Sequence, residues 1–316
     1  MCCSGDEIDA VFPNGPFVDI TFKDQLLKGT TGFKREKEED VKTQDDSQDE
    51  MARTRSTFRA KDRLFVNADC VIASRKYLAD NSVDLMICDP PFGIHGDKLD
   101  RHYNRNKKFV VPGYIEVPGD KYAEFSKRWI AEAARVLRPG GTIYVVSGRT
   151  HLGEVLGALE DCGLLQRDLI AWKYNFGVWT TKRPVTSHYH IPCYTKAGGK
   201  VTYNTWCRYG RKQLEENKRD REDVWLINRQ YKRGKEKNQN ELPDALVMKM
   251  IQYSSKPGDL VVDFFLGGGT TARVALGLDR RAVGFEKSPN IFARRVLALM
   301  QVERGSIEFR KPRADT

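Results

Sequence analysis

The sequence lacks several features that would place the protein in a membrane, a secretory route or a disulfide-bonded class. No run of about 18 apolar residues is present, which argues against a membrane-spanning helix. The start of the chain has no basic stretch followed by an apolar one, so no secretory signal is expected. The 7 cysteines are scattered without a Cys-x-x-Cys pair, which argues against a zinc site or disulfide framework and for a reducing compartment.

Histidine is also scarce, with 5 residues in the chain. Two of them, His188 and His190, would share one face of a strand, and Cys193 follows closely behind. No fourth ligand is evident near this group, whereas structural zinc takes four. The pattern therefore favours a structural or DNA-facing role for these residues over a metal site.

Charge is distributed unevenly along the chain. Residues 1–50 carry 6 basic and 13 acidic side chains, a net charge of −7, whereas the remainder carries 47 basic and 30 acidic ones, a net charge of +17. A basic domain suits a polyanionic partner, with DNA or RNA first. The charged, low-complexity run over 36–50 cannot bury enough apolar area to fold. Residues 1–60 are therefore predicted to be a disordered or loosely ordered acidic extension.

The sequence that is present is organised around Asp89-Pro90-Pro91-Phe92. The preceding run, Val83–Cys88, is short and mostly apolar, which is typical of a strand in a parallel sheet covered on both faces. Two prolines cannot continue the ladder of hydrogen bonds, so the motif ends the strand. It displays a carboxylate, a rigid proline pair and an aromatic ring at the carboxyl edge, where open α/β sheets bind ligands.

This motif has two interpretations. In the first, a flat base stacks on Phe92, which contributes about 1–3 kcal/mol. The amino group of the base then donates to the Asp89 carboxylate and the Pro90 carbonyl, which frees the nitrogen lone pair to attack an electrophilic methyl group. In the second, the strand simply ends in a proline turn, with Asp89 capping a neighbouring group. A tetrapeptide alone does not decide between them.

Strands and helices alternate over most of the chain from Arg63 onward, which predicts βαβ units and a mostly parallel sheet. The expected strands are 64–66, 83–88, 142–146, 168–173, 260–263 and 282–286, and the expected helices are 71–78, 121–137, 152–162, 244–254, 270–276 and 289–300. Residues 175–240 interrupt this rhythm with interleaved basic and aromatic side chains. Such interleaving favours a nucleic-acid surface over the alternative, a solvated helix face with acidic partners.

A second motif, Phe264–Thr271, places a glycine-rich turn between an expected strand and an expected helix. Such a turn lets a ligand approach the backbone at a helix N-terminus. Glu286 lies 17 residues beyond Gly269, close to the spacing of an acidic residue that accepts ribose hydroxyls. The alternative is a tight turn whose glycines serve packing alone.

Three nucleotide-like ligands are candidates for this turn. It reads Gly-x-Gly-x-x-Ala, ending at Ala272, which NAD-binding folds also accept. It lacks the Gly-Lys-Ser/Thr of a phosphate-binding loop, which argues against ATP hydrolysis. The third candidate is S-adenosylmethionine, a nucleoside with a positive sulfonium and no phosphate. Only this ligand supplies the methyl group that the Asp89 motif could use.

Together the two motifs resemble those of the amino-group DNA methyltransferases. Phe265–Gly269 resembles the Phe-x-Gly-x-Gly cofactor signature, and Asp89–Phe92 resembles the catalytic tetrapeptide. The tetrapeptide comes first, the basic insertion second and the cofactor turn last, which resembles the beta class, a circular permutation of the Rossmann-like methyltransferase fold. The resemblance covers Leu64 to Met300 and includes Asn67-Ala68-Asp69, Leu137–Gly141, Trp172–Asn175 and Lys256–Asp259.

The resemblance implies roles for particular residues. Catalysis is implied for Asp89, Pro90, Pro91 and Phe92. Binding of S-adenosylmethionine is implied for Asp69, Asp89, Asn240, Asp263, Phe265, Gly267, Gly269, Thr270, Thr271 and Glu286. Contacts with DNA are expected from the long loop over 93–120 and from the insertion, through Lys107, Lys108, Lys182, Arg183, His188, Arg208 and Arg211. No metal is required.

The chain also departs from the family pattern. The family often has His-Pro-Thr-Gln-Lys-Pro before the helix that precedes the cofactor strand, whereas residues 238–243 read Asn-Gln-Asn-Glu-Leu-Pro, in which Asn240 replaces the threonine. Phe92 stands where Tyr is common and preserves the stacking face. Asp-Pro-Pro rather than Ser-Pro-Pro favours adenine over cytosine as the target.

The sequence therefore predicts a site-specific DNA adenine-N6 methyltransferase that acts on a flipped-out adenine. The expected divisions are an extension (1–60), a catalytic half (61–174), a basic target-recognition insertion (175–240), a cofactor-binding half (241–303) and a tail (304–316). Cytosine-N4 methylation, an RNA substrate and a catalytically silent nucleic-acid binder remain as alternatives. The resemblance is compatible with a homodimer and a cognate restriction endonuclease. The expected location is cytoplasmic, beside the nucleoid in a bacterium or phage, or nuclear in a eukaryote.

Overall fold

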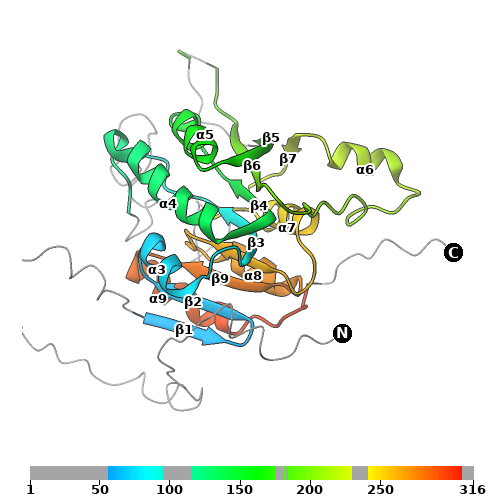
Figure 1. Ribbon diagram of the computed structural model, residues 1–316. Coiled ribbons are helices and arrows are strands. Elements are labelled where there is room, and N and C mark those ends of the chain that lie inside the picture. The colour runs from blue at the N-terminus through cyan, green and yellow to red at the C-terminus, as the bar shows by residue number, and fades with distance from the viewer. Residues whose placement is uncertain (1–55, 95–114, 176–180, 183, 230–240, 308–316) are drawn as a thin grey trace, which may run out of the picture.

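Strands and helices alternate through the part of the chain that the computed structural model describes, residues 56–94, 115–175, 181–182, 184–229 and 241–307 (Figure 1). The strands are β1 (Ser56–Ala60), β2 (Arg63–Asn67), β3 (Val83–Cys88), β4 (Leu137–Val145), β5 (Leu164–Lys173), β6 (His188–Lys196), β7 (Val224–Leu226), β8 (Leu260–Asp263) and β9 (Arg281–Phe285). The helices are α3 (Cys70–Tyr77), α4 (Tyr122–Val136), α5 (Leu152–Asp161), α6 (Leu214–Asp220), α7 (Asp244–Ser254), α8 (Thr270–Gly277) and α9 (Pro289–Met300), with a 3₁₀ turn, η3 (Gly119–Lys121), before α4.

All nine strands form one sheet in the order β1-β2-β9-β8-β3-β4-β6-β5-β7. The central strands β2, β9, β8, β3 and β4 are mutually parallel. Only β1 and β6 pair antiparallel with their neighbours among the described strands. This arrangement confirms the predicted mostly parallel α/β sheet. It also makes β3 and β8 neighbours, although they lie far apart in the sequence.

Helices cover both faces of the sheet, and alternate side chains of each strand supply a separate core on each face (Figure 1). Met86 and Cys88 of β3 belong to the core that includes residues of α3, α4 and α5. Leu85 and Ile87 belong to the core that includes residues of α7, α8 and α9. Burial on both faces explains why the strand reads as a continuous apolar run. None of the described helices is long and apolar enough to cross a bilayer.

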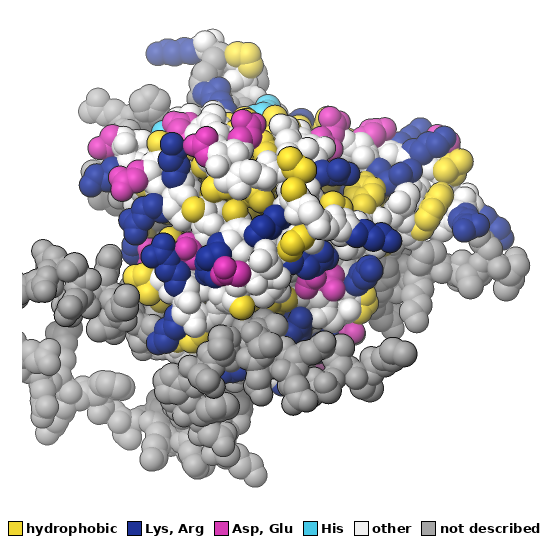
Figure 2. All heavy atoms as spheres, viewed as in Figure 1, with side chains coloured by type: hydrophobic (Ala, Val, Ile, Leu, Met, Phe, Trp, Pro, Cys, Tyr) yellow, Lys and Arg dark blue, Asp and Glu magenta, His cyan; other side chains and the backbone are white. Residues whose placement is uncertain are grey.

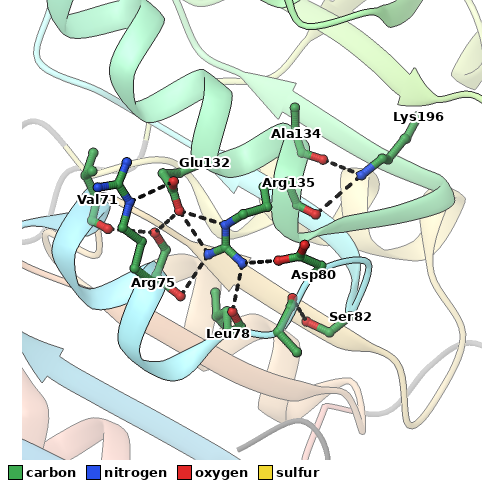
Figure 3. A network of polar contacts seen from close by, with 11 residues as sticks. Val71, Arg75, Leu78, Asp80, Ser82, Glu132, Ala134, Arg135 and Lys196 are labelled. Carbon is green, nitrogen blue, oxygen red and sulfur yellow. Dashed lines mark hydrogen bonds and ion pairs between the residues drawn. The ribbon is translucent and has the colours of Figure 1, made fainter.

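A polar network ties α3 to α4 (Figure 3). Glu132 of α4 accepts hydrogen bonds from Ser74 Oγ and from the Nε atoms of Arg75 and Arg135, each at 3.0 Å. Arg135 also donates to the carbonyl oxygen of Leu78 at 3.1 Å. Burial alone would raise the pKa of Glu132, but the arginine and serine donors outweigh it and hold that pKa below its ordinary value. This carboxylate is therefore a structural clamp between the two helices.

The folded region extends beyond the predicted boundaries at both ends. Residues 56–60, assigned from the sequence to the loosely ordered extension, form β1 and pair with β2. Their side chains are mostly exposed, so this edge strand carries no apolar periodicity that could reveal it. At the other end, the N–H groups of Gly305 and Ile307 donate to carbonyl oxygens at the end of α8, both at 2.9 Å. Residues 1–55 and 308–316 lie outside the described part.

The segment predicted as a single basic insertion, 175–240, contains part of the sheet. β6 lies between β4 and β5, and its Ile191 and Tyr194 are fully buried. The averaged composition of the segment hid this strand, because basic residues dominate on either side of a short apolar stretch. Among the described residues, the part that lies outside the sheet is therefore mainly the region around α6.

Candidate active site

The parallel strands bring the predicted motifs to one edge of the sheet. Asn67 ends β2, Glu286 follows β9, Asp263 ends β8, Asp89 follows β3 and Ser147 lies just beyond β4. Because these five strands run in the same direction, the segments that follow them share the carboxyl edge, where open α/β sheets bind ligands. The two motifs lie on directly adjacent strands, β3 and β8.

The chain leaves the Asp-Pro-Pro-Phe motif through a turn that only glycine fits. Gly93 has a φ of +67°, and a Cβ atom there would lie 2.5 Å from the Tyr122 ring. Its N–H donates to Glu116 Oε1 at 3.0 Å. Tyr122 in turn stacks on His151, with ring centroids 4.3 Å apart. The exit of the motif is therefore held against the start of α4, which fixes the position of Phe92.

The Asp89 carboxyl group is recessed and carries an unusual protonation equilibrium. Burial, followed by the nearby Asp263 carboxylate, raises the pKa of Asp89 to about 8, and Arg229 acts in the opposite direction. No described residue donates a hydrogen bond to the Asp89 oxygens. A polar group that is removed from water without a partner is unfavourable by a few kcal/mol. A carboxyl group of this kind, at the edge where such sheets bind ligands, is a candidate to accept hydrogen bonds from a ligand.

Phe92 belongs to an aromatic cluster that the sequence did not reveal as a unit. Its ring lies edge-on to Tyr189, with centroids 5.2 Å apart. Tyr189 also contacts Trp172 and Tyr174, at centroid distances of 5.7 and 5.2 Å. Trp172 and Tyr174 are two residues apart and therefore share one side of β5 and its extension. Arg229, after β7, lies against three of these rings.

The glycine-rich turn and Glu286 are joined directly. Gly267 and Gly269 have φ angles of +48° and +80°, in the left-handed region that favours glycine. The Gly267 N–H donates to one Glu286 oxygen at 2.9 Å, and the Ser288 N–H donates to the other at 2.7 Å. Burial raises the pKa of Glu286, while these two backbone donors oppose the rise. Each oxygen retains a lone pair, so the carboxylate can still accept the two hydroxyls of a ribose.

Asp263 supports the turn from within. Its Oδ1 accepts a hydrogen bond from the Phe265 N–H at 2.9 Å, and Thr271 also hydrogen-bonds to its carboxylate. Burial raises the pKa of Asp263 to about 7 despite these donors. Thr270 and Thr271 are buried at the start of α8. Asp263, Thr270 and Thr271, all predicted to bind the cofactor, therefore support the turn from its buried side.

Two of the three remaining predicted cofactor residues, Asp69 and Phe265, lie at the same edge. Asp69 caps α3 by accepting from the Val71 N–H at 3.0 Å, and its other oxygen pairs with Lys287 at 3.1 Å. The half-buried Phe265 ring packs edge-on against Trp129 at 5.2 Å. Asn240, predicted to replace the family threonine, lies outside the described residues.

Glu241 is a residue near the turn that sequence reasoning missed. Its side chain lies so close to Gly268 that a Cβ atom there would be 2.3 Å from Glu241 Cγ. The same carboxylate pairs with Arg295 of α9 at 3.0 Å. The departure from the family pattern at residues 238–243 therefore places an acidic side chain over the glycine-rich turn, and glycine at position 268 is required to admit it.

The predicted DNA-binding residues are placed only in part. Lys107, Lys108 and Arg183 lie outside the described residues. Lys182, His188 and Arg211 are exposed. Arg208 does not fit the prediction, because its guanidinium bonds internally to Asp220 at 2.7 Å and to Gln252 at 2.6 Å. Figure 2 shows basic side chains over the visible face, interspersed with acidic and apolar ones, so no single basic band stands out there.

The Cys88 thiol and the pair His188 and His190 also lie near this edge. Burial raises the pKa of Cys88 well above its ordinary value, so this thiol stays protonated and unreactive near neutral pH. The rings of His188 and His190 contact each other at 5.0 Å, as expected for residues on one face of a strand. The described residues contain no group of three or more His, Cys, Asp or Glu side chains placed to hold a metal ion.

Comparison with known proteins agrees with this geometry. The family model described as DNA methylase, of the N6/N4 methyltransferase family, matches residues 83–296. The type II methyltransferase M.HpaI of Haemophilus parainfluenzae is 31% identical over 225 residues, which cover 68% of this chain and 67% of that protein. The match thus spans about two thirds of that relative's length.

Solved structures share the fold at lower identity. The complex of M1.HpyAVI with SAM is 21% identical, with a TM-score of 0.55, and covers 75% of this chain and 98% of the other. The cytosine-N4-specific PvuII DNA methyltransferase is 18% identical, with a TM-score of 0.58, and covers 78% of this chain and 88% of the other. The family match extends from β3 into α9 and so contains both motifs. The chain belongs to the N6/N4 family of DNA methylases.

Proposed function

We propose that the protein is a site-specific DNA adenine-N6 methyltransferase that acts on an adenine flipped out of the duplex. The observation that carries this proposal is the Asp89 carboxyl group, recessed and without a described hydrogen-bond donor, one strand away from the glycine-rich turn. The family uses S-adenosylmethionine as its methyl donor. Asp-Pro-Pro in place of Ser-Pro-Pro supports adenine over cytosine.

The residues of the turn fit this cofactor. Glu286 offers a free lone pair on each oxygen for the ribose hydroxyls, and the positive φ angles of Gly267 and Gly269 keep the turn clear of side chains. When bound, S-adenosylmethionine supplies a methyl group on a positively charged sulfur. That positive charge would also favour the ionised form of Asp89 and Asp263.

In this reaction the protein positions the adenine amino group and makes its nitrogen more nucleophilic. The Asp89 carboxylate and the Pro90 carbonyl accept hydrogen bonds from its two N–H groups, which makes the nitrogen lone pair available. A bond then forms between this nitrogen and the methyl carbon as the bond from that carbon to sulfur breaks, and one amino proton leaves to solvent. Phe92 stacks on the flipped base and offsets part of the cost of unstacking it, a few kcal/mol. Most of the rate gain would come from holding the two reactants in line.

One assay tests both the reaction and the base. The protein is incubated with tritiated S-adenosylmethionine and either unmethylated DNA or RNA, and the digested product is analysed as nucleosides by mass spectrometry. N6-methyladenine is expected. Label on cytosine would keep the family and overturn the base assignment. Label on RNA alone, or no transfer with cofactor still bound, would replace the proposal by an RNA methyltransferase or a silent binder.

Partners belong to the same proposal. DNA is the proposed substrate, and M.HpaI is a type II methyltransferase, which supports a cognate restriction endonuclease as a partner of this chain. For a homodimer, light scattering should give twice the chain mass of 36.1 kDa. A mass of one chain at working concentration would remove the dimer from the proposal.

A further inference from the structure

The Arg229 side chain is held by aromatic rings on several sides. Its guanidinium carbon lies 4.9 Å from the centroid of Tyr174, 5.1 Å from that of Tyr189 and 5.7 Å from that of Trp172. A guanidinium within about 6 Å of a ring centroid is attracted by the ring, by about 0.5–1 kcal/mol when exposed and by more when desolvated. Three such rings hold the guanidinium of Arg229 in position.

This cage is part of the catalytic edge. Tyr189 links the two, because its ring is 5.1 Å from the Arg229 guanidinium and its centroid is 5.2 Å from that of Phe92. The cage residues also come from the sheet itself. β5 carries Trp172 and β6 carries Tyr189, while β7 leads into Arg229. Two of the rings that hold the cation are therefore carried by strands of the sheet.

Several ionisable groups face the Asp89 carboxyl group from the elements around it. Asp263 lies at the end of β8, Cys88 is the preceding residue on β3, and Tyr122 lies at the start of α4. Each of these is neutral or negative. Arg229 is the cation that acts on this carboxyl group among the described residues. Its charge therefore opposes the combined effect of burial and Asp263.

We propose that Arg229 is a positioning residue for methyl transfer, and that its caged guanidinium favours the ionised form of Asp89, which accepts a hydrogen bond from the amino group of the target base. The inference deepens the proposed function and rests on it for the identity of the reaction. The aromatic rings around position 229 favour arginine over lysine. A planar guanidinium stacks against rings and keeps its proton, whereas a lysine ammonium is more easily neutralised on burial.

The first experiment is the pH dependence of kcat/KM for methyl transfer, measured for the wild type and for Arg229→Gln, Arg229→Lys and Arg128→Gln. Activity should rise with pH as Asp89 ionises. Removal of a cation raises the pKa of a carboxyl group on which it acts. The rising limb of the pH profile of kcat/KM should therefore shift to higher pH in Arg229→Gln, by about one pH unit. At pH 7 this variant should lose about tenfold in rate, and much of the loss should be recovered at pH 9.

The two companion variants separate charge from structure. Arg229→Lys keeps a positive charge, so its rising limb should stay near that of the wild type even if its rate falls. Arg128 is exposed on α4, so Arg128→Gln changes the net charge equally and should not move the limb. A loss in Arg229→Gln that is the same at every pH would overturn the proposal. If Arg229→Gln does not fold, a limb shifted upward in Arg229→Lys by a full unit would do so.

A second measurement does not depend on activity. Aspartate carboxyl carbons labelled with ¹³C are titrated by NMR in the wild type and in Arg229→Gln, and Asp89 is assigned from the signal missing in Asp89→Asn. The Asp89 midpoint should rise on loss of Arg229. An unchanged midpoint refutes the inference even if the protein methylates adenine. A raised midpoint in a protein that does not methylate DNA supports the charge pairing and refutes the proposed function instead.

Discussion

Glu132 of α4 and Asp89 beyond β3 are carboxyl groups withdrawn from solvent in the same domain, but their surroundings differ. Glu132 accepts hydrogen bonds from Ser74, Arg75 and Arg135, which hold its pKa low. Asp89 has no described donor, and burial raises its pKa to about 8. The first carboxylate is satisfied by the fold and stabilises it. The second is left for a ligand to satisfy, at a cost to stability, which is typical of functional sites.

The largest expected effect is on catalysis. Asp89→Ala removes the acceptor that the base requires, so methyl transfer should fall by at least about a hundredfold, as on removal of a single preorganised group elsewhere. Binding of S-adenosylmethionine, measured by calorimetry, should stay within a few-fold, since Glu286 and the glycine-rich turn are untouched. Unimpaired transfer would show that Asp89 has been assigned to the wrong role.

Substitution of Glu132, the carboxylate between α3 and α4, should affect stability and not catalysis. Glu132→Ala leaves buried Ser74 and half-buried Arg135 without their carboxylate, so the free energy of unfolding should fall by about 3 kcal/mol. The specific activity of the folded protein should not change. Urea denaturation followed by circular dichroism measures the loss. Glu124→Ala, an exposed position on the same helix, serves as the control and should change stability by less than about 0.5 kcal/mol.

The two carboxyl groups should also respond to pH with opposite signs. The folded state keeps the Asp89 proton up to about pH 8, whereas the unfolded chain releases it near 3.8, so Asp89 makes folding less favourable as pH rises between these values. Asp89→Asn should therefore be more stable than the wild type above pH 8, with the gap closing towards pH 4. Thermal melts across this range measure the gap.

Glu132 sets the reference for that experiment. Its pKa lies below the ordinary 4.5, so its stabilising effect is present above that pH and is lost as pH falls further. In Glu132→Ala the difference from the wild type should consequently shrink in acid, where the Asp89→Asn difference has already vanished. A stability gap for Asp89→Asn that is constant with pH would mean that Asp89 is ionised throughout.

The smallest expected effect concerns the ring beside Asp89. Phe92→Ala removes the surface on which the base stacks, so kcat/KM should fall by about tenfold, corresponding to the lower part of the 1–3 kcal/mol range for base stacking. Phe92→Tyr keeps the ring and should recover most of that loss. If Phe92→Ala and Phe92→Tyr have the same kcat/KM, then Phe92 serves packing against Tyr189 and not the base.

The sequence predicts both motifs at the carboxyl edge of the sheet because local chemistry encodes where each strand ends. Proline ends a strand after Asp89, and glycine permits the positive φ angles of the second turn. Helices 244–254 and 289–300 also begin and end as predicted, since their apolar residues recur at helical spacing. The mostly parallel sheet that joins the motifs was predicted from the alternation of strands and helices, together with the resemblance to amino-group DNA methyltransferases.

The missed features depend on contacts between residues far apart in the sequence. In the sequence Arg229 is one of several basic residues in a basic run. The fold places it against Tyr174 and Tyr189. Arg208, from the same region, instead bonds to Asp220 and Gln252 inside the protein. Composition predicts the same role for both arginines, and only their neighbours distinguish them. β1 escaped detection because an exposed edge strand has no apolar face to reveal it.

The adjacency of β3 and β8 has a consequence for synthesis of the protein. The strand that bears Asp89 leaves the ribosome early, but its neighbour and the glycine-rich turn are translated almost 180 residues later. Contacts between such distant segments form late in folding. A chain that terminates before Leu260 therefore holds the base-binding motif without the turn that would hold a methyl donor. Truncated products are expected to be inert as methyltransferases, so premature termination cannot yield a partly active modifying enzyme.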